Sequence, residues 1–375
     1  MSILIKHVAE QTFLWFESKN QYVVIDKVTG LVIEQIQNRC SLDKITDDLS
    51  LELGISLEAA NKFVLDAFQF YKDHTQEVSN KIQSFPKSPK PPDHFDYYKY
   101  YKIDDVVIKV GYASTKELTL IDLKFSHLSV SPSKESKHYF RIFIDAGLIH
   151  LFVDATFVGS WSSDEVHYFQ GKFSMELVQV LYGKKEREWL GVFHASAVGR
   201  NGKSMLFLGD SGNGKSTSLA LLQAHGFECV ADDFVPISVE SQLVYKFPAA
   251  ISVKRNSLPV LLPYYPVLEN TQEHHLKQLS KHVRYLPPVY KNSSNRMPCI
   301  GLVFIKYDAD AAFSCVELPV HKAFEKMVPD SWLSPLAENA SVFLDWFTEL
   351  PCYELTYHNT LEMITEVNKL YAQEL

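Results

Sequence analysis

The segment "GRNGKSMLFLGDSGNGKSTSLALL" (residues 199–222) constrains the fold of this chain most strongly, because it contains Gly-Lys-Ser twice. A loop G-x-x-x-x-G-K-[ST] between a buried strand and a helix wraps phosphate groups with its backbone N–H groups, and the helix N-terminus adds a favourable dipole. The second copy fits this pattern. Met205–Leu208 is predicted as the strand, Gly209–Ser216 as the loop, and Thr217–Ala224 as the start of a helix that ends at Gly226.

The first copy of Gly-Lys-Ser does not fit the pattern. Ala197 stands where the loop needs its first glycine, and Ser204 leads directly into a strand. The dipeptide Asn-Gly at 201–202 is instead a favourable two-residue hairpin turn. We therefore expect a turn at the first copy and a phosphate-binding loop of the Walker A type at the second.

A pair of acidic residues follows the loop. In "GFECVADDF" (residues 226–234) a buried run ends in Asp232 and Asp233, which lie 17 and 18 residues after Lys215. Ligands of open α/β sheets bind at the carboxyl ends of strands, so these carboxylates are expected to face bound phosphates and Mg²⁺. One of them is suited to accept the proton of an attacking hydroxyl. The alternative is that the pair only binds a metal-bound water and caps a helix.

A histidine precedes the loop. "VFHASAV" places His194 at the start of the strand that leads into the hairpin, fifteen residues before Gly209. Taken alone, a single histidine in an apolar run favours a hydrogen-bonded core residue over an active-site residue.

Composition excludes several classes of protein. The 375 residues carry a formal net charge of −8, which argues against nucleic acid as a partner. The five cysteines contain no C-x-x-C pair, as expected of reduced thiols rather than of a disulfide framework or zinc site. The N-terminus lacks the apolar core of a signal peptide, and no uncharged apolar run is long enough to span a membrane. We expect a soluble, cytoplasmic chain.

A proline-rich stretch divides the chain. "SFPKSPKPPDHF" (84–95) is typical of a semi-rigid linker, so residues 1–83 are predicted to form a small domain of their own. Within it, residues 20–33 are predicted as two short strands, and the apolar spacing in 42–53 and 57–71 predicts two helices. A hairpin followed by two or three helices suggests a winged-helix-like domain; the alternative is a helical cap without a binding role.

The remainder, residues 96–375, is predicted as a second domain. Its first part (96–190) is β-rich, with the alternation of antiparallel strands in 139–145 and 148–161. A buried strand is predicted at 302–306 and a helix at 360–371. The fold class expected for the whole chain is α/β, or α+β when the β-rich part is included.

The histidine, the sequence "GDSGNGKS" and the acidic pair, in this order, resemble the catalytic domain of HPr kinase/phosphorylase and its relatives from about residue 193 to 235. The resemblance implies a fold similar to HPr kinase and phosphoenolpyruvate carboxykinase, with ATP and Mg²⁺ as cofactors. It implies that Asp233 is the general base, that Asp232 supports the metal, and that His194 lies in the active site. It also implies a nucleotide site in which Lys215 binds the β- and γ-phosphates and Ser216 binds Mg²⁺, formed by Gly209, Asp210, Ser211, Gly212, Asn213, Gly214, Lys215, Ser216 and Thr217.

The chain departs from the family pattern at two positions. Ala195 follows the histidine where the family usually has glycine, and Leu258 stands where HPr kinases have a Mg²⁺-binding glutamate. The stretch "PAAISVKRNS" (248–257) instead resembles P-x-x-I-S-x-K-N-x-S of HPr-kinase-related proteins outside sugar regulation. That resemblance implies that Lys254 faces the phosphates and that the segment around Arg284 closes over the site.

The N-terminal domain resembles, in its layout, PqqD-like domains, which bind leader segments of ribosomally made peptides. We therefore expect a kinase that phosphorylates a hydroxyl, with a serine of a peptide or small protein as acceptor, and homo-oligomers as in relatives. Two alternatives remain open. One is a kinase for a small hydroxyl compound such as free serine or a sugar-like acceptor. The other is a nucleotide-sensing protein without turnover, which Ala195 and the missing glutamate favour.

Overall fold

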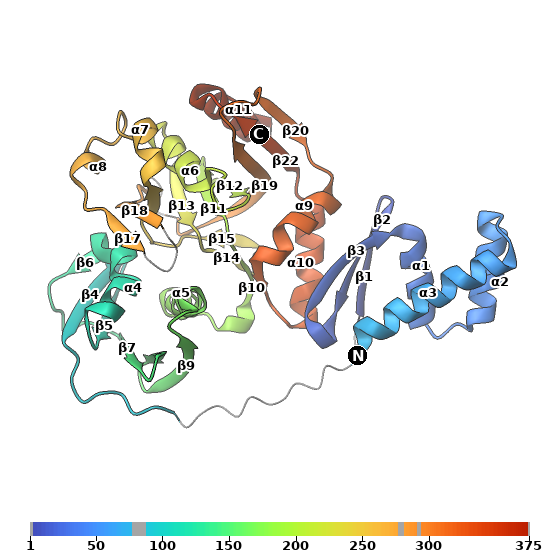
Figure 1. Ribbon diagram of the computed structural model, residues 1–375, viewed down its shortest axis with the longest axis horizontal. Helices are drawn as coiled ribbons and strands as arrows, with labels where there is room; N and C mark the ends of the chain where they lie inside the picture. The colour runs from blue at the N-terminus through green and yellow to red at the C-terminus, as the bar shows by residue number, and fades with distance from the viewer. Residues whose placement is uncertain (1–2, 77–87, 277–280, 291–293, 374–375) are drawn as a thin grey trace. The chain divides into compact units, whose positions relative to one another are not determined.

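The computed structural model describes residues 3–76, 88–276, 281–290 and 294–373, which form a mixed α/β chain with several sheets (Figure 1). Two compact units are present. Unit 1 comprises Met1–Gln83 and Leu318–Leu350, and unit 2 comprises Ser84–Glu317 and Pro351–Leu375. The break after Gln83 coincides with the start of the predicted linker. Residues 84–87 of that linker lie outside the described residues, and 88–95 form neither helix nor strand.

Unit 1 begins with an antiparallel sheet whose strands follow chain order: β1 (Ile3–Val8), β2 (Gln11–Phe16) and β3 (Gln21–Asp26). Three helices follow, namely α1 (Lys27–Gln37), α2 (Leu42–Leu53) and α3 (Leu57–Thr75). The helices predicted at 42–53 and 57–71 are therefore confirmed. β1 and β2 were not predicted.

The second strand predicted within residues 20–33 is wrong, because that part of the chain is helix α1. Asp26 caps the helix, and its side chain accepts hydrogen bonds from the Thr29 amide at 2.9 Å and the Thr29 hydroxyl at 2.6 Å. Val32, Ile33 and Ile36 are buried in the same core as β2. Burial at helical spacing thus outweighs the β-branched composition that favoured a strand.

Gly30 allows α1 to approach β2 closely. A Cβ atom at this position would lie 2.1 Å from Oγ1 of Thr12, whose side chain is fully buried. We expect Gly30→Ala to lower the free energy of unfolding of unit 1 by about 1–3 kcal/mol, because overpacking must displace the helix or the strand. Thermal unfolding of the full chain measures this, with Gly171→Ala, where a Cβ meets nothing within 4 Å, as the control. Equal melting temperatures of both variants would contradict the expectation.

Residues 318–350 were assigned by the sequence to the second domain, whereas the structure places them in unit 1. They form α9 (Val320–Met327), β21 (Ser331–Leu333) and α10 (Ala337–Glu349). Phe324 of α9 packs edge-on against Phe13 with ring centroids 4.9 Å apart, and Phe343 of α10 packs in the same way against Tyr22 at 5.2 Å. This aromatic packing joins segments more than 300 residues apart, which no local pattern reveals.

The first sheet of unit 2 has the strand order β6-β4-β5-β7-β8-β9. Its elements are β4 (Tyr97–Ile103), β5 (Val106–Tyr112), α4 (Thr115–Phe125), β6 (Ser129–Val130), β7 (His138–Asp145), β8 (Leu148–Val153), β9 (Thr156–Ser162) and α5 (Val166–Tyr182). The strands predicted at 139–145 and 148–161 are present as β7, β8 and β9. The antiparallel pairing predicted for them is confirmed between β7 and β8 and between β8 and β9, whereas β5 and β7 are parallel and α4 lies in the crossover between them.

The second sheet of unit 2 carries the loop. Its strands within the unit run in the order β13-β11-β12-β19-β15-β14-β10, and β22 pairs with both β19 and β20. The elements are β10 (Trp189–Phe193), β11 (Ser196–Arg200), β12 (Lys203–Leu208), α6 (Lys215–Ala224), β13 (Glu228–Asp232), β14 (Val235–Ser238), β15 (Leu243–Tyr245), β19 (Arg296–Tyr307), β20 (Ser314–Glu317), β22 (Cys352–Tyr357) and α11 (Thr360–Gln373). The strands predicted at 205–208 and 302–306 and the helix at 360–371 are confirmed.

The first Gly-Lys-Ser copy lies in the β11–β12 hairpin, as predicted. Asn201 and Gly202 have φ angles of 52° and 76°, which the two central residues of a type I′ turn require. A third sheet completes unit 2, with strand order β16-β18-β17 and the elements β16 (Ile251–Lys254), α7 (Leu258–Leu261), α8 (Val267–Asn270), β17 (His274–Leu276) and β18 (Lys281–Leu286).

Candidate functional site

The topology of the second sheet brings the predicted site residues to one edge. β12 and β19 are parallel, while β11 is antiparallel to both of its neighbours, β12 and β13. The carboxyl ends of β12 and β13 and the amino end of β11 therefore lie side by side. The acid-bearing strand β13 is not adjacent to the loop-bearing strand β12, because β11 lies between them. Ser196, at the start of β11, pairs with Phe207 on one side and with Asp232 on the other.

The glycine-rich loop Gly209–Ser216 connects β12 to α6. Gly209 has a φ of 137°, and a Cβ there would lie 2.8 Å from the carbonyl oxygen of Ile305 in β19. Only glycine meets both conditions. The Asn213 carbonyl accepts a hydrogen bond from the Tyr307 amide at 3.0 Å, which ties the loop to the end of β19. Residues 210–212 are exposed, so the middle of the loop is open to a ligand.

Lys215 and Thr217 begin helix α6. The Lys215 side chain is only 7 % exposed, and its ammonium group donates hydrogen bonds to the carbonyl oxygens of Gly209 and Asp210. It thus folds back over the loop. The Thr217 hydroxyl is 2.7 Å from the Ser257 hydroxyl, which links α6 to the segment after β16.

Asp232 lies among hydroxyl and amide donors. Its Oδ1 accepts from the hydroxyls of Ser196 at 2.7 Å and Ser216 at 3.1 Å, and its Oδ2 accepts from the Ser252 amide at 3.2 Å. Burial and the neighbouring Asp233 carboxylate raise the pKa of Asp232 to about 6, although these donors act in the opposite direction.

The surroundings of Asp233 lower the pKa of its carboxyl group, whereas those of Asp232 raise it. Asp233 adopts a left-handed backbone conformation with a φ of 64°, and its side chain is 33 % exposed. Lys124 of α4 lies 3.4 Å from its carboxylate. Burial alone would raise the pKa of Asp233, but Lys124, His194 and Lys215 together hold it below its usual value. Asp233 is therefore ionised at neutral pH, whereas Asp232 takes up a proton as the pH falls through about 6.

His194 lies in the bend between β10 and β11 rather than at the start of a strand, and it is exposed. His194 is among the groups that lower the pKa of Asp233, so it belongs to the edge where the acidic pair lies. The core position favoured by its apolar neighbours is wrong, because His194 lies at an interruption between β10, whose last residue Phe193 pairs with Val235 of β14, and β11, whose first residue Ser196 pairs with Asp232 of β13. Ala195, next to it, is buried.

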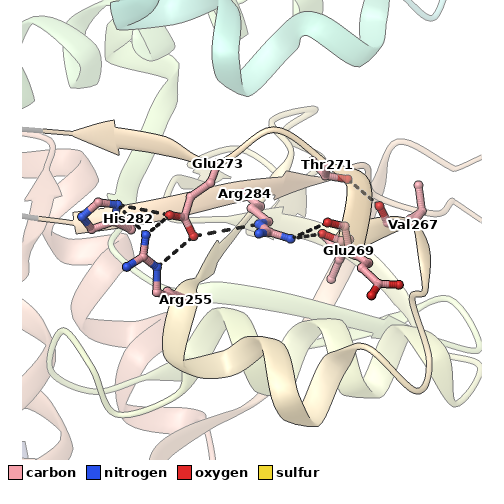
Figure 2. Close-up of polar contacts among 8 residues, drawn as sticks. Arg255, Val267, Glu269, Thr271, Glu273, His282 and Arg284 are labelled. Atoms are coloured by element: carbon pink, nitrogen blue, oxygen red, sulfur yellow. Dashed lines mark hydrogen bonds and ion pairs between the residues drawn. The ribbon is translucent and has the colours of Figure 1, made fainter.

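Lys254 and Arg284 come from the third sheet. Burial, Lys281 and Lys215 lower the pKa of Lys254, which places its ammonium group in the field of the loop lysine. Arg284 has other partners. Its guanidinium group donates to the carbonyl oxygens of Leu268 and Glu269 and pairs with Glu273 at 4.0 Å (Figure 2). The structure brings Lys254 to the loop, whereas Arg284 is engaged with α8 and Glu273; its predicted part in nucleotide binding remains a prediction.

Several residues at this edge were not found in the sequence. They are Lys124, Ser196, Ser252, Lys281 and Tyr285. Each comes from a different strand, helix or turn than the loop. Ser252 lies within the stretch 248–257 and Tyr285 lies beside Arg284, but the resemblance pointed to Lys254 and Arg284 there. Tyr285 is placed here by electrostatics, since Lys124 and Asp233 both act on the pKa of its phenol, which burial raises.

The hydroxyl of Ser216 and the carboxylate of Asp232 suit Mg²⁺. Mg²⁺ prefers hard oxygen ligands, keeps several waters, and needs only one or two carboxylates besides substrate phosphates. Among the described residues no group of three or more His, Cys, Asp or Glu side chains is placed to hold a metal ion. Leu258 packs against the apolar core.

The raised pKa of Asp232 has a consequence for stability. Because the folded state binds this proton more tightly than the unfolded state, stability falls as the pH rises from about 4 through 6 and stays lower above that range. We expect Asp232→Asn, which carries no charge, to raise the free energy of unfolding at pH 8 by about 1–3 kcal/mol. The gain should shrink as the pH falls toward 4.

Urea unfolding at pH 8 and pH 5 tests this expectation. Asp164→Asn, at an exposed position of unit 2, is the control and should change little. A variant Asp232→Asn that is less stable than the wild type at pH 8 would show that the hydrogen bonds of the carboxylate outweigh its burial.

Searches against models of known protein families and against curated proteins found no match for this chain. Within the described residues, no helix combines the length and the apolar character needed to cross a membrane.

Proposed function

We propose that this chain is an ATP- and Mg²⁺-dependent kinase that transfers the γ-phosphoryl group to a hydroxyl, with a serine of a peptide or small protein as the acceptor. One observation carries the proposal. A glycine-rich loop with its lysine and serine lies at the same sheet edge as two carboxylates of opposite electrostatic character, one bonded to Ser216 and the other ion-paired with Lys124. Phosphoryl transfer to a hydroxyl needs these groups together.

The loop is suited to bind the nucleotide phosphates. Its exposed middle and the start of α6 present backbone N–H groups and a positive helix end. The Lys215 ammonium group donates hydrogen bonds to loop carbonyls. On binding of a nucleotide it would move to the β- and γ-phosphates, which are charged and therefore better acceptors. Lys254 adds a second cation. Burial and the neighbouring Lys281 and Lys215 lower its pKa, and a bound anion would relieve the repulsion among these lysines.

The Ser216 hydroxyl and Asp232 would hold Mg²⁺ beside the phosphates. When bound, the ion neutralises the charge of the phosphate oxygens. Ser196 and the Ser252 amide position the Asp232 carboxylate for this role, since they fix both of its oxygen atoms.

Asp233 would act as the general base. The acceptor oxygen forms a bond to the γ-phosphorus, the bond from that phosphorus to the bridging oxygen of ADP breaks, and the hydroxyl proton passes to Asp233. Its lowered pKa keeps the free enzyme in the proton-accepting form at neutral pH. The negative charge of a bound triphosphate would raise that pKa toward neutrality, where a general base works best.

We further propose that the loop-bearing part of unit 2 shares the fold of HPr kinase and its relatives, and that residues 1–83 act as a PqqD-like domain that delivers a peptide. The supporting features are the strand–loop–helix order, the acidic pair, and a small antiparallel sheet followed by three helices. The acceptor would then be part of a peptide chain.

Transfer of label from γ-labelled ATP, with Mg²⁺, into an extract of the source organism tests the proposal. The wild type is compared with Asp233→Asn. Label in a peptide or protein only with the wild type is the expected result. Label in a small metabolite would favour a small-molecule kinase, which needs no domain that delivers a peptide. ATP binding without transfer to any component would favour a nucleotide sensor.

A further inference from the structure

The sheet β16-β18-β17 turns one of its faces toward the candidate site. Successive side chains of a strand point to opposite faces, and residues paired across antiparallel strands share a face. Lys254 pairs with Val283, so Lys281 and Tyr285, two residues before and after Val283, lie on the same face as Lys254. Arg284 lies on the opposite face, with Glu273 and α8, as Figure 2 shows.

The two ends of this face reach the two parts of the site. At one end, the Lys281 ammonium group lies 3.4 Å from the hydroxyl of Ser211, in the exposed middle of the loop. At the other end, Tyr285 lies in the field of Lys124 and Asp233. Lys254 acts with Lys281 and Lys215 as a group of cations, since both of the other lysines lower its pKa in addition to burial.

We infer that Lys281 is a further nucleotide-binding residue, which contacts the outermost phosphate of a nucleoside triphosphate and makes the site prefer ATP to ADP. The inference rests on the proposed function. Neither the loop motif nor the stretch around Lys254 includes this residue, which the β18 strand alone brings to the loop.

The charges explain why the outermost phosphate is the target. Lys215, at the end of the loop, would bind the β- and γ-phosphates from one side. Lys254 and Lys281, on the sheet β16-β18-β17, would bind from the other side. A phosphate held between the two sides meets all three ammonium groups, and the terminal phosphate of ATP carries the additional charge that ADP lacks. The Ser211 hydroxyl is a neutral acceptor, so a phosphate oxygen would replace it as the stronger partner of Lys281.

The test is the affinity of the full chain for ATP and for ADP, each with Mg²⁺, measured by isothermal titration calorimetry. Lys281→Met removes the charge and keeps the length of the side chain. We expect it to weaken ATP binding about tenfold, as loss of one charge-assisted hydrogen bond would, and to change ADP binding less than about twofold. Lys281→Arg should retain most of the ATP affinity. The control is Lys203→Met, in the first Gly-Lys-Ser copy at the other end of β12.

The outcomes separate this inference from the proposed function. A wild type that binds neither nucleotide would overturn both. A wild type that binds ATP, with Lys281→Met binding it equally well, would overturn the inference alone. Equal losses of ATP and ADP affinity would also overturn it, because Lys281 would then contact the inner phosphates or support the loop.

Discussion

Lys215→Met is expected to weaken ATP binding by about 10- to 100-fold, the value of a hydrogen bond to a charged group, and to lower phosphoryl transfer by a further factor of about 10² or more. Lys215 is the cation held closest to the loop, bonded to the carbonyls of Gly209 and Asp210 and 7 % exposed. Its positive charge would stabilise both the negative charge of the bound phosphates and the negative charge that develops during transfer. Methionine keeps the apolar stem that packs at the start of α6, so the helix should remain.

The repeated tripeptide provides a matched control for Lys215. Lys203→Met makes the same change in the first Gly-Lys-Ser copy, which lies in the β11–β12 turn, at the opposite end of β12 from the loop. Nucleotide affinity, measured by calorimetry or by displacement of a fluorescent analogue, should be unchanged in this control. If the two variants bind ATP equally well, the second copy is not the phosphate-binding loop.

Asp233→Asn is expected to lower the rate of transfer by about 10²–10⁴, the usual contribution of general acid–base catalysis, with ATP affinity within a few-fold of wild type. The amide cannot accept the hydroxyl proton. Asparagine tolerates the left-handed backbone conformation of Asp233 better than alanine does, so the turn after β13 should be preserved. The variant thereby separates loss of the base from loss of the turn.

A matched control for Asp233→Asn is Asp104→Asn. Asp104 is exposed and also has a positive φ, of 51°, but it lies in the β4–β5 hairpin. Single-turnover transfer and ATP affinity are measured for both variants. Full transfer activity in Asp233→Asn would reject Asp233 as the base, and a large loss of ATP affinity would mean that its charge is needed to hold the lysines in place.

The β-rich part of unit 2 also contributes to the site, which its sequence does not indicate. Lys124 lies at the end of α4, and its carbonyl accepts a hydrogen bond from the Ala250 amide at 2.8 Å just before β16. Phe125 packs edge-on against Phe247 in the same region, with ring centroids 5.9 Å apart. These contacts hold the Lys124 ammonium group beside Asp233. Residues 96–190 are thus joined to the loop-bearing sheet through the candidate site.

The sequence by itself determined the features that depend on neighbouring residues. The strand–loop–helix at 205–224, the turn at 201–202 and the position of the acidic pair at the end of a strand follow from local backbone preferences, glycine above all, and the structure has them. Helices α2, α3 and α11 follow from apolar spacing in the same way. A local pattern suffices here because the residues that decide the conformation lie within one or two turns of each other.

Only the tertiary structure decided which distant segments pack together and which side chains face the loop. Residues 27–33 became helix because burial against β2 outweighed their β-branched composition, and residues 318–350 joined unit 1 through aromatic packing with Phe13 and Tyr22. Lys124 and Lys281 reach the site from elements about 90 residues before and about 65 residues after Lys215 along the chain. Their places depend on strand order, pleat and side-chain packing between distant segments. Such packing depends on contacts between residues far apart in the chain, so no single stretch of sequence reveals it.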